Sequence, residues 1–130
     1  MIKPRDGTHT LDEFALQDVF SLLNGASISA MKVDVSGSAV QTSVYNVNRA
    51  GATLTDCSIS NVNMAGTQAL WTGINATNGA SITVSNTTFA NDQQMLGCIV
   101  AQGQGTTVSV DRVNITNVAG SLGAVSDFAT

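Results

Sequence analysis

The chain has 130 residues, a mass of 13.3 kDa and a formal net charge of −4, a length that predicts one domain with room for its own core. Its five Lys and Arg residues are scattered, which argues against a nucleic-acid partner because neutralising phosphates requires clustered cations. Charged residues make up only 11% of the chain, aromatic residues only 5%, and no stretch approaches the ~20 apolar residues of a membrane span.

The first predicted element is an α-helix over residues 11 to 23. Thr10 and Glu13 have the spacing of a capping box, and the Asn-Gly pair at residues 24 and 25 would end the helix. Its apolar residues cover most of the circumference, more than the single stripe of a surface helix. We therefore expect residues 1–24 to cap the first coil of the fold below, and a protein partner to cover the rest of the helix.

Four related ten-residue phrases follow this segment. They recur every 24, 30 and 26 residues, counted between their last residues. A recurrence of this length is typical of a solenoid, in which each repeat buries its apolar face by stacking on its neighbours. The phrases occupy residues 28–37, 52–61, 82–91 and 108–117.

Within each phrase aliphatic residues alternate with polar ones, which predicts strands with one buried face. The alternation slips by one residue in the middle of the phrase, so we expect a bend there. The inward positions then form four columns, which are Ile28, Ala52, Ile82 and Val108; Ala30, Leu54, Val84 and Val110; Val33, Cys57, Thr87 and Val113; and Val35, Ile59, Phe89 and Ile115.

A weaker phrase follows each of these and predicts the remaining strand of each coil. No helical pattern occurs after residue 24, so the coil is all β. The weaker phrases are Val40 to Val44, Leu70 to Ile74, Leu96 to Ile99 and Leu122 to Val125. Residues 25–130 are thus expected to form a right-handed parallel β-helix of about four coils, near residues 25–50, 51–78, 79–104 and 105–130.

The stretches 97–100, 107–110 and 113–117 resemble repeats of the pectin-lyase-like superfamily of right-handed parallel β-helix proteins. The resemblance covers about residues 25 to 130. It implies the fold but no particular activity, because that fold serves lyases, hydrolases, adhesins and inert scaffolds alike.

One outward column carries ionisable groups and is the first candidate site. A lyase of this fold would need a basic residue above a calcium ion held by several carboxylates, and Asp56 is the only acid in the column. We favour a solvated ladder with a weak pair between Lys32 and Asp56. The column consists of Lys32, Asp56, Asn86 and Arg112.

No catalytic residue, cofactor or metal ligand is assigned. The chain lacks a phosphate-binding glycine loop and lacks Cys, His and carboxylate groups with metal-ligand spacing. Cys57 and Cys98 could form a disulfide or remain buried thiols. The position of Cys57 in an apolar column favours a small hydrophobic role.

The last position of each phrase forms a polar column. Asparagine tolerates the left-handed conformation that a tight turn needs, and stacked side-chain amides can hydrogen-bond from one coil to the next. We therefore predict a structural ladder rather than a ligand site. The column is Gly37, Asn61, Asn91 and Asn117.

The predicted function is a non-enzymatic structural or interaction module, within a larger extracellular or surface-associated protein or assembly, that meets a protein partner at the open C-terminal coil. One alternative is part of a polysaccharide lyase or hydrolase, with a carbohydrate ligand. A second is ice binding, because one outward column is entirely hydroxylated. That column is Ser29, Thr53, Thr83 and Ser109.

Overall fold

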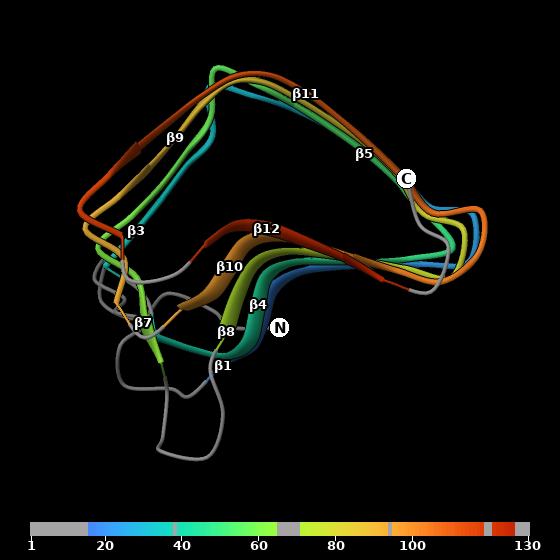
Figure 1. The fold of residues 1–130 in the computed structure, drawn as a ribbon, viewed down its shortest axis with the longest axis horizontal. Coiled ribbons are helices and arrows are strands. Elements are labelled where there is room, and N and C mark those ends of the chain that lie inside the picture. Colours follow the sequence, from blue (N-terminus) through green and yellow to red (C-terminus); the bar gives the residue numbers. More distant parts are fainter. Residues whose placement is uncertain (1–15, 38, 65–70, 94, 119–120, 127–130) are drawn as a thin grey trace, which may run out of the picture.

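The computed structural model describes residues 16–37, 39–64, 71–93, 95–118 and 121–126 (Figure 1). Within them every regular element is a β-strand. The strands are β1 (Leu16–Leu23), β2 (Ser27–Met31), β3 (Asp34–Ser36), β4 (Ala39–Asn48), β5 (Gly51–Thr55), β6 (Ser58–Ser60), β7 (Asn63–Met64), β8 (Trp71–Thr77), β9 (Ser81–Ala90), β10 (Met95–Gln102), β11 (Thr107–Thr116) and β12 (Ser121–Ser126).

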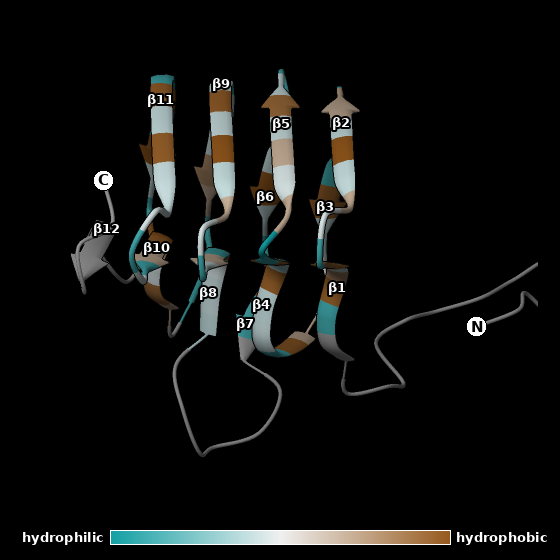
Figure 2. Ribbon diagram, turned by 90° about the vertical axis from the view of Figure 1, so that its right-hand side faces the viewer, coloured by the Kyte–Doolittle hydropathy of each residue, from teal (hydrophilic) through white to brown (hydrophobic). Residues whose placement is uncertain are grey.

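These strands form two parallel sheets, between which the chain alternates. The repeat sheet holds the four ten-residue phrases, as β2 with β3, β5 with β6, β9 and β11, in that spatial order. The return sheet has the order β1-β4-β8-β10-β12, with β7 also pairing with β4. From β2 to β11 the chain completes three turns of an all-β parallel solenoid, whose stacked rows are seen side by side in Figure 2.

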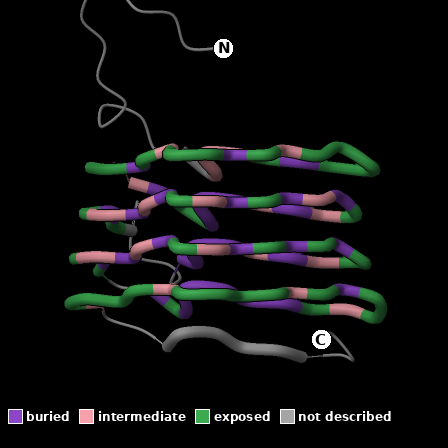
Figure 3. The backbone as a smooth tube through the Cα atoms, turned by 90° about the horizontal axis from the view of Figure 1, so that it is seen from above, coloured by how far each residue is buried: buried purple, intermediate pink, exposed green. Residues whose placement is uncertain are grey.

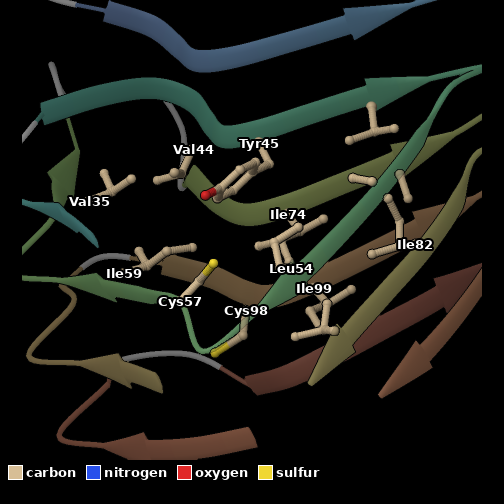
Figure 4. Close-up of a cluster of buried hydrophobic side chains, with 14 of the residues drawn as sticks. Val35, Val44, Tyr45, Leu54, Cys57, Ile59, Ile74, Ile82, Cys98 and Ile99 are labelled. Atoms are coloured by element: carbon tan, nitrogen blue, oxygen red, sulfur yellow. The ribbon is translucent and has the colours of Figure 1, made fainter. Parts of the chain in front are cut away.

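The register of the repeat sheet confirms the predicted inward columns. Ile82 pairs with Ala52 on one side and with Val108 on the other, and Phe89 pairs with Ile59 and Ile115. Each repeat phrase forms one row of the repeat sheet. The column members in the two middle rows, residues 52–61 and 82–91, are almost completely shielded from solvent and build the centre of the core (Figure 4). The buried members of the columns are Ala30, Val35, Ala52, Leu54, Cys57, Ile59, Ile82, Val84, Thr87 and Phe89.

The predicted bend lies at the sixth residue of each repeat-sheet row, counted from the first residue of its first strand. Lys32, Asp56, Asn86 and Arg112 all have positive φ, between 48° and 60°. One left-handed residue turns the strand, so that two outward residues in succession separate the inward positions on either side of the bend. This explains the slip in the alternation.

Two further corners of each turn use the same device. The second corner is the predicted asparagine column, with φ of 71° at Gly37 and 53° to 56° at the asparagines. The third corner joins the return sheet to the repeat sheet and was not predicted. Its first left-handed residues are Asn24, Arg49, Asn78 and Gly103, and Gly25, Gly79 and Gly105 at this corner also have positive φ.

The predicted N-terminal helix is wrong for residues 16 to 23, which form strand β1, and residues 11–15 lie outside the described residues. β1 pairs with the edge of β4. Phe20 stacks on Tyr45 with ring centroids 4.8 Å apart, and Asp18 accepts a hydrogen bond of 2.6 Å from Ser43 Oγ. A solenoid edge offers backbone partners that outweigh a weak helix preference. The Asn-Gly pair is therefore a corner between two strands, not a helix end.

The weaker phrases form the return strands, as predicted, but their glycines do not stack in one column. Gly97 pairs with Thr72 and Gly123 pairs with Ile99. Gly73 lies at a position where a side chain would overlap its neighbours in the core. A Cβ at Gly73 would lie 2.5 Å from the carbonyl oxygen of Cys98 and 2.6 Å from the ring of Phe89.

Candidate functional site

The ionisable outward column lies along the first corner of the repeat sheet, and its members are exposed. Asn86 Nδ2 donates to Asp56 Oδ1 at 2.6 Å, which joins two neighbouring rows. Among the described residues the one ion pair joins Arg112 to its neighbour Asp111 at 3.5 Å, with both side chains more than two-thirds exposed. The expected pair between Lys32 and Asp56 is therefore not formed.

The charged groups of this column do not share one binding position. Arg112 and Asp56 lie two rows apart, ~10 Å at the usual strand spacing, too far for one small ion or reacting group to contact both. In the described part of the chain no three His, Cys, Asp or Glu side chains gather into a metal cradle. Opposite polar groups one row apart supply the hydrogen bonds that hold the corner.

The asparagine column contains the predicted side-chain hydrogen bond between rows. Asn117 Nδ2 donates to Asn91 Oδ1 at 3.0 Å, and the backbone N–H of Asn61 donates to Ala90 O at 3.0 Å. All three asparagines are exposed at a left-handed corner. Each therefore fixes a turn through its backbone while its amide is available to the next row.

A second set of amide bonds, in the return sheet, was missed from the sequence. Asn75 Nδ2 donates to Asn46 Oδ1 at 3.3 Å, and Asn78 Nδ2 donates to Asn48 Oδ1 at 3.1 Å. In the sequence these asparagines are spaced by about one coil. That spacing did not predict the bonds, because the weaker phrases do not define which residues of neighbouring return strands pair.

The buried carboxylate of Asp92 is the second feature that the sequence did not reveal. Asp92 occupies the inward position that Val62 holds one row earlier, and it has no exposed surface. Its Oδ1 accepts the backbone N–H of Val62 at 3.0 Å, whereas Oδ2 has no partner. Burial raises the pKa of Asp92 to about 6, against the lowering effect of hydrogen bonds from the Val62 and Ala90 backbone.

Both cysteines are free thiols in the core, which decides between the two alternatives left open by the sequence. Cys57 Sγ donates to Ala30 O at 3.4 Å, and Cys98 Sγ lies 3.9 Å from the Met95 sulfur. Burial, followed by the negative charge of Asp92, raises the pKa of Cys98 to about 11. Neither thiol has the exposure of a nucleophile, and the raised pKa of Cys98 also opposes formation of its thiolate.

The hydroxyl column is aligned across all four rows of the repeat sheet. Ser29, Thr53, Thr83 and Ser109 are successive register partners, and all four are exposed. The outward column on the N-terminal side contains Gly51, so hydroxyl groups do not occupy every position of the surface.

The two sheets end differently at the C-terminal end of the solenoid. β11 pairs with β9 on one side and with no other described strand, whereas the return sheet continues through β12. Val110 and Ile115 of β11 are 45% and 41% exposed, although their column partners Val84 and Phe89 are fully buried. Figure 3 shows this loss of burial along the last repeat-sheet row.

Comparison of the chain with family models, with curated proteins and with solved structures gives no match. The parallel solenoid is therefore established by the strand register, and the resemblance to the pectin-lyase-like superfamily stays a prediction. Within the described residues no helix has the length and apolar character to cross a membrane.

Proposed function

We propose that the chain is a non-catalytic structural module of a larger extracellular or surface-associated protein or assembly, and that it makes its principal contact at the edge of β11. Apart from the outward hydroxyl column, regular chemistry occurs in the inward columns and at the corners, where it serves stacking. The outward groups of the first corner are spread along the solenoid, where Asn86 bonds to Asp56 in the adjacent row and Arg112 pairs with its chain neighbour Asp111.

One observation carries this proposal. The apolar column that is fully buried at Leu54 and Val84 becomes 45% exposed at Val110, and the column that is fully buried at Ile59 and Phe89 becomes 41% exposed at Ile115. An edge strand with exposed aliphatic side chains and unpaired backbone groups is a template for association. The edge of β11 is therefore the surface at which we expect another protein segment to bind.

The test is association in solution. We expect the chain to self-associate or to bind a neighbouring part of its assembly in sedimentation, with slower amide hydrogen exchange in β11 once bound. The double substitution V110K/I115K should prevent association because two charges would be buried at the contact. T53K/T83K is the matched control, since it places two lysines on an exposed outward column. A monomer whose β11 amides are already as protected as those of β9 contradicts the proposal.

The hydroxyl column supports ice binding as a second candidate, because Thr53 and Thr83 are exposed register partners on paired parallel strands. Freezing-point hysteresis tests it directly. T53K/T83K should abolish the hysteresis, whereas Thr88→Lys, beyond the corner of the same sheet, should leave it unchanged. A wild-type chain without hysteresis removes this candidate.

A further inference from the structure

The edge of β11 is a step rather than a complete end face. β12 extends the return sheet by one strand beyond β10, while the repeat sheet has no described strand beyond β11. The position beside β11 is therefore one strand wide and ten residues long, the length of β11 itself. A flat end of another solenoid does not fit such a step, because β12 projects beside it. A single extended strand does.

The hydrogen bonds between the earlier rows of the repeat sheet show which backbone groups of β11 face the open position beside it. The N–H groups of Lys32 and Asp56 each donate to a carbonyl of the next row, at 3.0 and 3.1 Å, and the carbonyl of Cys57 accepts from the next row at 3.0 Å. By register, the N–H of Arg112 and the C=O of Val113 hold these positions in β11. They are the groups that an added strand would pair.

Side chains at the edge specify what the added strand must carry. Aliphatic residues opposite Val110 and Ile115 would bury the exposed ends of two core columns. An asparagine opposite Asn117 could donate to its Oδ1, as Asn117 donates to Asn91. These requirements are those of the chain's own repeat phrase.

The bend fixes the direction of the added strand. In a parallel strand in register, a left-handed residue stacks on Arg112, as Arg112 stacks on the left-handed Asn86. In an antiparallel strand with matching aliphatic positions, Arg112 would lie opposite the residue equivalent to Asp111, so the two bends would miss each other by one residue. Every strand pair in the structure is parallel.

The register also fixes where the added strand would begin relative to β12. Gln102 pairs with Ser126, so the position beside Thr107 corresponds to the fifth residue after Ser126. The four repeat phrases already lie in the repeat sheet, and residues 1–15 do not contain the phrase.

We propose that the β11 edge binds one further repeat phrase as a parallel, in-register strand, with aliphatic residues at its inward positions and a glycine or asparagine at its bend. This inference rests on the proposed function, since it names the chemistry of the segment that the edge contacts. It fits the strand-addition mode, in which backbone hydrogen bonds provide affinity and alternate side chains provide specificity.

The experiment supplies such a phrase at the position that the register predicts. The full chain is extended after Thr130 by a copy of residues 81–91, SITVSNTTFAN. The matched control extension is ISVTSNTTFAN, which has the same composition but directs the first two aliphatic residues outward. A free peptide of each sequence, added to the unextended chain, tests binding without the tether.

We expect the matched extension to raise Tm and to slow exchange of the Arg112 amide by roughly two- to tenfold, the range expected for one gained backbone hydrogen bond. The shifted extension should do neither. Equal effects of the two extensions, or no effect of either, overturn the proposal. If the unextended chain still associates through β11 while neither extension has an effect, the strand inference fails and the proposed function stands.

Discussion

Asn117 donates its side-chain amide to the Oδ1 of Asn91 across adjacent rows, at 3.0 Å, and both residues have left-handed backbone conformations. The two roles are separable, because the backbone role depends on φ and the ladder role depends on the amide. Glycine can perform the first and not the second, which makes a direct test possible.

Asn91→Ala should lower the free energy of unfolding by about 1–2 kcal/mol, because alanine disfavours the left-handed conformation and cannot bond to Asn117. Asn91→Gly should cost less, since it retains the turn. Thermal or urea unfolding of the two variants gives both values. If Asn91→Ala is as stable as the wild type, the ladder and the corner contribute nothing at this position.

Asp92 predicts an unusual pH dependence of stability. Its pKa is about 6 in the folded chain and 3.8 ordinarily, so between these values the folded state holds a proton that the unfolded state has released. Stability from this group is thus present at low pH and is lost as pH rises from about 3.8 to 6, by up to ~3 kcal/mol.

Asp92→Asn keeps an oxygen for the Val62 amide and removes the buried charge. We expect this variant to be more stable than the wild type at pH 7 and to show a smaller fall in Tm between pH 4 and pH 7. Comparing the Tm difference across this range isolates Asp92 from the other carboxylates. A difference that does not change with pH contradicts the assignment of the raised pKa.

Gly73→Ala should destabilise the fold by about 1–3 kcal/mol, the usual cost of overpacking a core. The new methyl group would overlap the Cys98 carbonyl and the Phe89 ring. Gly51→Ala is the matched control, because a Cβ there meets only the Ser81 carbonyl oxygen at an ordinary 3.7 Å. Denaturant midpoints for the two variants should therefore differ clearly, and equal midpoints would show that the core relaxes around Gly73.

The thiols of Cys57 and Cys98 should be unreactive toward a thiol reagent in the native chain at pH 8 and reactive after unfolding in urea. Both are buried, and the raised pKa of Cys98 keeps its thiol protonated at that pH. Absorbance of the released reagent group measures the reaction. Rapid reaction of either thiol without denaturant would show that it is accessible in the native fold.

The sequence by itself determined the repeat sheet. Alternation with period two at fixed inward positions, such as Ile59 and Phe89, allows only one register that keeps the core apolar, and the slip in that alternation located the bend. The asparagine corner followed from the same register, because few residue types tolerate a left-handed turn. These features are local patterns repeated along the chain.

Other features were decided only by the tertiary structure. Residues 16 to 23 resemble a helix in isolation but form β1, because β4 presents an unpaired edge and Tyr45 a surface for Phe20. The crowding at Gly73 comes from the Cys98 carbonyl of the neighbouring strand and from the Phe89 ring of the opposite sheet, and Asp92 meets the backbone of Val62, 30 residues away. The exposure of Val110, on which the proposed function depends, reflects what lies beside β11 in space, and no local pattern encodes that.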